Sequence, residues 1–100
     1  MNKINYLCLL LILLLFPFIS VSAQEVNISG VVIDNEGLTM PGVSVAVKGA
    51  TSGTITDLDG KFNISVPKGT TLIFSFIGYT TKEVKVGNES ILNITLNAST

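Results

Sequence analysis

Two aspartates separated by one residue have the clearest potential for chemistry in this sequence. Asp57 and Asp59 lie in the segment Asp57-Leu-Asp-Gly60, and paired carboxylates can act as an acid and a base or bind calcium through oxygen. The segment lacks the further ligands and the terminal glutamate of an EF-hand loop. As a turn it needs no other residue, because aspartate supports the bend and Gly60 accepts a positive φ. We therefore interpret the pair as a turn and expect no metal site.

Histidine and cysteine, two residue types that often perform catalysis, are missing from most of the chain. The 100-residue sequence has no His, and its one Cys, Cys8, lies in an apolar N-terminal segment. Residues 24–100 therefore offer no His or Cys as a nucleophile, a base or a soft metal ligand. We predict a protein without enzymatic activity and without a cofactor. The remaining carboxylates are scattered along the chain, at Glu25, Asp34, Glu36, Glu83 and Glu89.

The charge of the chain excludes one class of partner. Residues 24–100 carry five of the six Lys and all seven Asp and Glu residues, which gives a formal net charge of −2. That balance provides no electrostatic basis for binding nucleic acid or an anionic membrane. The lysines are spread along the chain, as is typical of solubility and edge protection rather than of a binding patch.

Two surface patterns each allow a functional and a purely structural interpretation. Five asparagines open an N-x-S/T pattern, which marks glycosylation in secreted eukaryotic proteins, but period two already places Asn and Ser/Thr together on one outward strand face. Four aliphatic residues could form an outward apolar surface for a partner, although ordinary scatter of exposed side chains explains them as well. The asparagines are Asn27, Asn63, Asn88, Asn93 and Asn97, and the aliphatic residues are Val31, Ile33, Ile73 and Ile77.

Residues 1–23 have the pattern of a secretion signal. Lys3 supplies a positive start, an apolar run extends from Leu7 to Ile19, and Val21-Ser-Ala23 places small residues at the −3 and −1 positions of a signal peptidase site. The apolar run is shorter than the ~20 residues that a membrane-spanning helix needs. We predict cleavage between Ala23 and Gln24 and no membrane span after it, with an uncleaved anchor as the alternative.

From Glu25 onward the apolar residues alternate with period two, which predicts strands and leaves no room for a helix longer than one turn. Turn signals recur about every 8–12 residues, the spacing of an all-β sandwich with about seven strands. The strand over 71–77 is apolar on both faces and should be central, whereas the short strand over 54–56 should lie near an edge. The shared apolar faces consist of Ile28, Gly30, Val32, Val43, Val45, Val47, Phe62, Ile64, Val66, Leu72, Phe74, Phe76, Val84, Val86, Leu92, Ile94 and Leu96.

The motifs between Ile28 and Tyr79 resemble those of the carboxypeptidase D regulatory-like domain. The specific part is the joint spacing of Thr56-Asp-x-Asp-Gly-x-Phe62 and Ser75-Phe-Ile-Gly-Tyr79. The resemblance implies that residues 24–100 form a seven-stranded antiparallel β-sandwich of the Greek-key type, like transthyretin, with no catalytic residue of its own. It gives a structural role to Gly30, Pro41, Gly42, Gly49, Thr56, Asp57, Asp59, Gly60, Phe62, Pro67, Gly69, Gly78 and Tyr79.

The segment Ser75–Tyr79 looks like the version of this domain at the N-terminus of SusC-type TonB-dependent outer-membrane receptors. In those receptors the domain lies in the periplasm, ahead of a TonB-box segment, a plug and a transmembrane barrel that imports glycans or peptides. The resemblance implies an exported, non-catalytic accessory domain in a Gram-negative bacterium, with the TonB system or receptor components as partners. The sequence has no plug or barrel, which suggests a truncated or split receptor, and it does not specify an oligomeric state.

Two other interpretations stay open. The chain could be a free-standing secreted or periplasmic binding module for carbohydrate or protein, or the accessory domain of a separately encoded hydrolase. Against carbohydrate, the sequence has no Trp, and the one Tyr in residues 24–100 is Tyr79, inside the Gly-Tyr motif. The DNA that follows the codon for Thr100 would distinguish these interpretations from the receptor.

Overall fold

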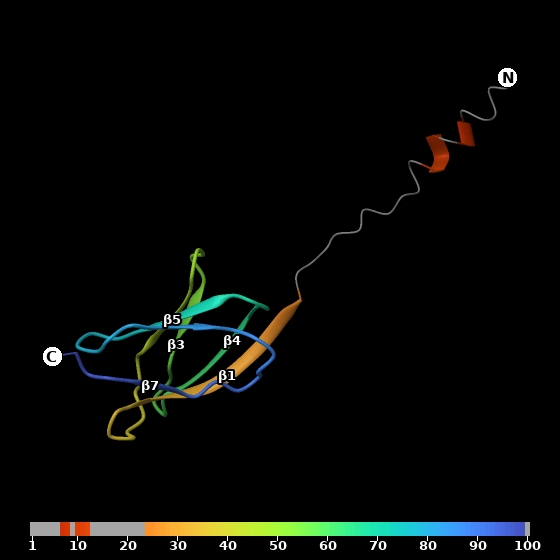
Figure 1. Cartoon of the computed structure of the whole chain (residues 1–100). Coiled ribbons are helices and arrows are strands. Elements are labelled where there is room, and N and C mark those ends of the chain that lie inside the picture. The colour runs from red at the N-terminus through yellow and green to blue at the C-terminus, as the bar shows by residue number, and fades with distance from the viewer. Residues whose placement is uncertain (1–6, 9, 13–23, 100) are drawn as a thin grey trace.

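The computed structural model describes residues 7–8, 10–12 and 24–99, and residues 24–99 form a sandwich of two β-sheets (Figure 1). One sheet has the strand order β4-β1-β7 and the other has the order β3-β2-β5-β6. The predicted all-β sandwich is confirmed. The strands are β1 (Glu25–Asp34), β2 (Ser44–Val47), β3 (Gly53–Ile55), β4 (Lys61–Pro67), β5 (Thr71–Ser75), β6 (Lys82–Lys85) and β7 (Ile94–Leu96).

Most of the predicted secretion signal, including Ala23, lies outside the described residues. Residues 7–8 and 10–12 are helical, and Gln24 is the first residue of the continuous described chain. Among the described residues, no helix is long and apolar enough to cross a membrane.

β1 shows how period two builds the sandwich. Ile28 and Val32 are fully buried between the sheets, whereas Asn27 and Ser29 are exposed on the outward face. β4 pairs with β1 in antiparallel register from Glu25 opposite Pro67 onward. The outward face of this sheet is therefore lined by alternate residues of β1 and β4. The register of the two strands sets which polar side chains lie opposite each other on this face.

One pair of strands contradicts the predicted antiparallel sandwich. β1 and β7 run parallel, with Val32 opposite Ile94 and Asp34 opposite Leu96. Parallel neighbours need a long connection, and here β2 to β6 lie between the two strands in the chain. Alternation of side chains identifies each strand but carries no information about the direction of its neighbour, so the prediction was wrong for this pair. The other paired strands are antiparallel.

Buried residues from both sheets form one core. β5 lies between β2 and β6, and β3 lies at the edge of the same sheet, which confirms the central and edge positions predicted for these two segments. Phe74 of β5 packs edge-on against Phe62 of β4, with 5.4 Å between the ring centres, so this pair joins the two sheets. The core consists of Ile28, Val32, Met40, Val43, Val45, Val47, Phe62, Val66, Leu72, Phe74, Val86, Ile94 and Leu96, with Ile64, Val84 and Leu92 partly buried against it.

Phe76 was predicted on the same apolar face as Leu72 and Phe74, and this prediction is wrong. β5 ends at Ser75 and a turn follows, in which Gly78 has a φ of 86°. Phe76 is 39% exposed and packs on Tyr79, with 5.8 Å between ring centres. The chain turns here because the residues around Tyr79 pair with residues 97–99, with the Ser99 N–H donating to the Gly78 carbonyl at 2.9 Å.

The four aliphatic residues considered as one outward surface do not form one. Val31 and Ile33 alternate with buried Val32 and lie on the outward face of the β4-β1-β7 sheet. Ile73 alternates with buried Leu72 and lies on the outward face of the other sheet, on the opposite side of the sandwich. Ile77 projects from the turn after β5 and is 95% exposed. Their spacing along the chain gave no information about which layer each strand joins.

Candidate functional site

Asp57 uses its carboxylate to close the turn between β3 and β4. Its Oδ1 accepts hydrogen bonds from the backbone N–H groups of Asp59 and Lys61, both at 2.9 Å. Two backbone bonds complete the turn, from the Asp57 N–H to the Lys61 carbonyl and from the Gly60 N–H to the Asp57 carbonyl, again at 2.9 Å. The described residues contain no group of three or more His, Cys, Asp or Glu side chains placed to hold a metal. The geometry of this carboxylate is that of a turn residue.

The same turn occurs a second time, between β1 and β2. Asp34 Oδ1 accepts from the N–H groups of Glu36 and Leu38 at 2.8 and 2.9 Å. Gly37 occupies the place of Gly60, and both glycines have a positive φ, of 85° and 75°. In both turns an Asp is followed three residues later by a Gly. The sequence predicted each turn separately, but not that the two share one geometry.

We expect Asp57→Ala to lower the free energy of unfolding by about 1 kcal/mol, because two exposed N–H groups exchange a carboxylate for water. Urea denaturation of residues 24–100 would measure the change. Asp59→Ala is the matched control, since the structure uses only the Asp59 N–H in the turn, and a surface substitution of this kind costs less than about 0.5 kcal/mol. Equal losses in both variants, together with stabilisation by added calcium, would indicate a metal site instead.

Thr56, next to this turn, holds two segments together from inside the protein. Its hydroxyl donates to the Met40 carbonyl at 2.7 Å and accepts from the Val43 N–H at 2.8 Å. Thr56 is 5% exposed and is the one buried polar residue of the described chain. The motif position was predicted to be structural, but nothing in the sequence indicated that its hydroxyl satisfies two backbone groups of the segment before β2.

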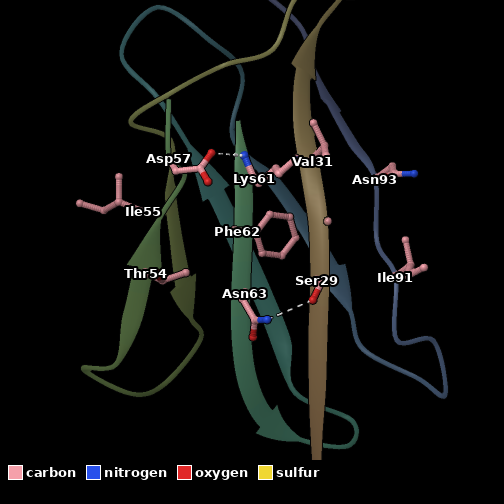
Figure 2. Close-up of a pocket in the computed structure, with 11 residues that line it drawn as sticks. Ser29, Val31, Thr54, Ile55, Asp57, Lys61, Phe62, Asn63, Ile91 and Asn93 are labelled. Atoms are coloured by element: carbon pink, nitrogen blue, oxygen red, sulfur yellow. Dashed lines mark hydrogen bonds between the residues drawn. The ribbon is translucent and has the colours of Figure 1, made fainter. Parts of the chain in front are cut away.

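A shallow hollow of about 570 Å³ lies over the outward face of the β4-β1-β7 sheet, beside β3 (Figure 2). Figure 2 shows Asn63 of β4 pointing toward Ser29 of β1, and the Asn63 Nδ2 donates to Ser29 Oγ at 3.2 Å. Ile55 flanks these residues on one side and Ile91 on the other. The lining residues are Ser29, Gly30, Val31, Thr54, Ile55, Asp57, Lys61, Phe62, Asn63, Ile91 and Asn93.

The hollow is lined mostly by neutral polar groups and aliphatic side chains. Its polar side chains are mostly neutral hydroxyl and amide groups, and its one cation is Lys61. The carboxylate of Asp57 at its rim already accepts two backbone hydrogen bonds. Neutral amides and hydroxyls beside aliphatic side chains suit hydrogen bonding and apolar contact with a ligand or partner.

Local sequence patterns did not predict this hollow. Period two placed Ser29 and Asn63 on outward faces, but only the register of β1 with β4 sets them opposite each other. Ile91 forms an isolated parallel bridge with Ser29 of β1, whereas Ile55 belongs to β3 of the other sheet, and both isoleucines are well exposed. The position of Ile55 depends on the way the two sheets stack, and that of Ile91 depends on pairing between remote segments; local patterns encode neither.

The remaining predicted motif residues lie at bends and strand ends rather than together. Pro67 is the last residue of β4, Pro41 is exposed before β2, and Tyr79 is half-buried. The one ion pair among the described residues joins Lys48 Nζ to Glu83 Oε1 at 3.2 Å, and such an exposed pair contributes little to stability. A positive φ occurs at Gly37, Gly42, Gly49, Gly60, Gly69 and Gly78.

Comparison with known families and proteins gives a consistent result. Residues 28–100 match the model of the CarboxypepD_reg-like domain. The TonB-dependent receptor P3 of Formosa agariphila is 44% identical over 78 residues, which cover 76% of this chain and 8% of the receptor. The TonB-dependent receptor SusC of Bacteroides thetaiotaomicron is 38% identical over 103 residues, which cover all of this chain and 10% of the receptor. The chain thus spans a tenth or less of the length of these curated relatives.

A solved structure supports the fold alone. The 3-chlorocatechol 1,2-dioxygenase of Rhodococcus opacus superposes with a TM-score of 0.58 over 78% of this chain and 61% of that enzyme, at 13% sequence identity. At this identity the likeness carries no information about activity.

Proposed function

The chain belongs to the CarboxypepD_reg-like domain family, and on this basis we propose that it is the non-catalytic periplasmic accessory domain of a SusC-type TonB-dependent outer-membrane receptor. In this role the domain contacts the rest of the receptor or the TonB system during nutrient uptake. In this proposal the domain comprises residues 24–100, exported by a signal that is cleaved between Ala23 and Gln24.

One observation carries the proposal. The relatives named as TonB-dependent receptors match 76% to all of this chain but only 8–10% of their own length. A domain of this family therefore occurs in them as a small part of a much larger receptor. The N-terminal domain of such receptors lies in the periplasm, which supports the same location for this chain.

The geometry supports a role in contact rather than chemistry. The carboxylate of Asp57 is engaged by the backbone of its own turn, and the hollow in Figure 2 contains neutral polar groups and one lysine. Proton transfer needs a titratable side chain positioned within hydrogen-bond reach of a substrate. The lining of the hollow offers surface for binding instead.

A domain exchange would test the proposal in a receptor that is already identified. The segment of Bacteroides thetaiotaomicron SusC that matches this chain would be deleted in one strain and replaced by this chain in another. We expect deletion to slow growth on the substrate of that receptor and the replacement to restore most of the lost rate. Receptor levels in the outer membrane, measured by immunoblot, control for failed assembly.

Two results would contradict the proposal. One is a replacement strain that grows no better than the deletion strain although the receptor is present at a normal level. The other is an unrelated gene directly after the codon for Thr100 in the source genome, where the proposal expects an in-frame or frameshifted continuation into a plug and a barrel.

The hollow favours one alternative, a free-standing binding module. Ser29, Asn63 and Asn93 provide hydroxyl and amide groups beside exposed Ile55 and Ile91, which suits a neutral polar ligand with apolar faces. Affinity capture from periplasm with the purified chain would separate the two functions. Recovery of a polysaccharide without an envelope protein would favour the alternative.

A further inference from the structure

Gln24 occupies a defined place at the entrance to the fold. β1 begins at Glu25, which lies opposite Pro67 in the register with β4. The Lys68 N–H donates to the Gln24 carbonyl oxygen at 3.1 Å, so the main chain is fixed as far as this carbonyl. The Gln24 side chain is exposed to solvent.

We propose that Gln24, once it becomes the N-terminal residue, closes into a pyroglutamate ring. The inference rests on the cleavage after Ala23 that forms part of the proposed function. The free α-amine attacks Cδ of the Gln24 side-chain amide, a bond forms between the backbone nitrogen and Cδ, and the Cδ–Nε2 bond breaks. The amide nitrogen leaves as ammonia with the proton that the amine loses. No oxidation, reduction or second reactant is involved.

The fold leaves the reacting atoms free. The amine and the side-chain amide both belong to Gln24, so their approach breaks none of the pairs that begin at Glu25. The carbonyl that accepts from Lys68 takes no part in the ring and keeps its hydrogen bond. Cyclisation therefore adds a compact cap at the start of β1 without changing the register of β1 and β4.

The modification has two physical consequences. An α-amino group has a pKa of about 7.7–8.0 and is mostly charged at neutral pH, so the lactam removes up to one positive charge from a domain whose side chains already sum to −2. A lactam also offers no free amine to an aminopeptidase. The exported chain should be more acidic and more resistant to N-terminal trimming than its sequence alone indicates.

Mass spectrometry of the exported protein tests the inference. The full chain, with residues 1–23, would be expressed in a Gram-negative host and purified from the periplasm. We expect an intact mass equal to that of residues 24–100 less one ammonia, and removal of one residue by pyroglutamyl aminopeptidase. Gln24→Asn is the matched control, because its side chain is one methylene shorter and cannot form a five-membered lactam; it should keep its full mass and lose residues to an ordinary aminopeptidase.

Two results would overturn the inference: one concerns the cyclisation and the other the cleavage site. A chain that begins at Gln24 with its full mass, and keeps it on prolonged incubation, shows that cleavage occurs without cyclisation. A chain that begins at any other residue shows that the proposed cleavage site is wrong. Neither result bears on the match to receptors, which the domain exchange tests separately.

Discussion

Gly30→Ala should leave the domain largely unfolded. A Cβ at Gly30 would lie 1.8 Å from the Leu92 carbonyl oxygen and 2.9 Å from Cε1 of Phe62. The carbonyl cannot easily move away, because the segment around Leu92 is bonded to β1 at Ser29, with the Leu92 N–H donating to the Ser29 carbonyl at 2.9 Å. Overpacking typically costs about 1–3 kcal/mol and occasionally more, and a clash with backbone that is held in place belongs at the upper end of that range. A single core of this size supplies only about 3–5 kcal/mol in total, so most of the stability is lost.

Circular dichroism and urea denaturation of residues 24–100 would measure the effect. Gly69→Ala is the control, because Gly69 has a positive φ of 89° but open space around its Cβ position. That variant should lose only about 1–2 kcal/mol, the usual cost of a left-handed backbone for alanine. A Gly30→Ala protein as stable as the Gly69→Ala protein would show that the segment at Leu92 yields, and that close packing at Gly30 is unimportant.

Gly30 also marks the boundary of what the sequence could predict. Period two correctly placed it between Ile28 and Val32 on the inward face of a strand. The need for glycine comes from Leu92, which is far away in the chain and reaches β1 through a parallel pairing. A glycine in a strand pattern signals close approach of another backbone, but the pattern does not say which backbone approaches.

Features of the fold that depend on local patterns were predicted from the sequence, and features that depend on contacts between remote segments were not. The all-β sandwich, the central β5 and the edge position of β3 follow from local alternation and from the apolar content of single strands, so the sequence predicted them. The parallel partner of β1 and the departure of Phe76 from the core depend on contacts between remote segments. The hollow also depends on such contacts. Ser29 meets Asn63 through the register of β1 with β4 and Ile91 through a parallel bridge, whereas Ile55 reaches the hollow through the stacking of the two sheets.

Thr56→Val should lower the free energy of unfolding by about 2–4 kcal/mol, because valine keeps the shape of threonine and removes only the hydroxyl. Two backbone groups then lose their partner, the Met40 carbonyl and the Val43 N–H. Each unsatisfied buried group costs about 1–3 kcal/mol. Met40 and Val43 are themselves buried, so water cannot easily replace the hydroxyl.

Thr56→Ser provides the matched control, since it keeps the hydroxyl and loses a methyl group, at a cost of about 1 kcal/mol. Urea denaturation would give the two stabilities, and hydrogen exchange at the Val43 amide would report on the bond itself. We expect this amide to stay protected in Thr56→Ser and to exchange much faster in Thr56→Val. If the valine variant were as stable as the serine variant, the segment before β2 would be held by other contacts. Because valine has nearly the same shape as threonine, the stability change in Thr56→Val reports the loss of the hydroxyl rather than a change in packing.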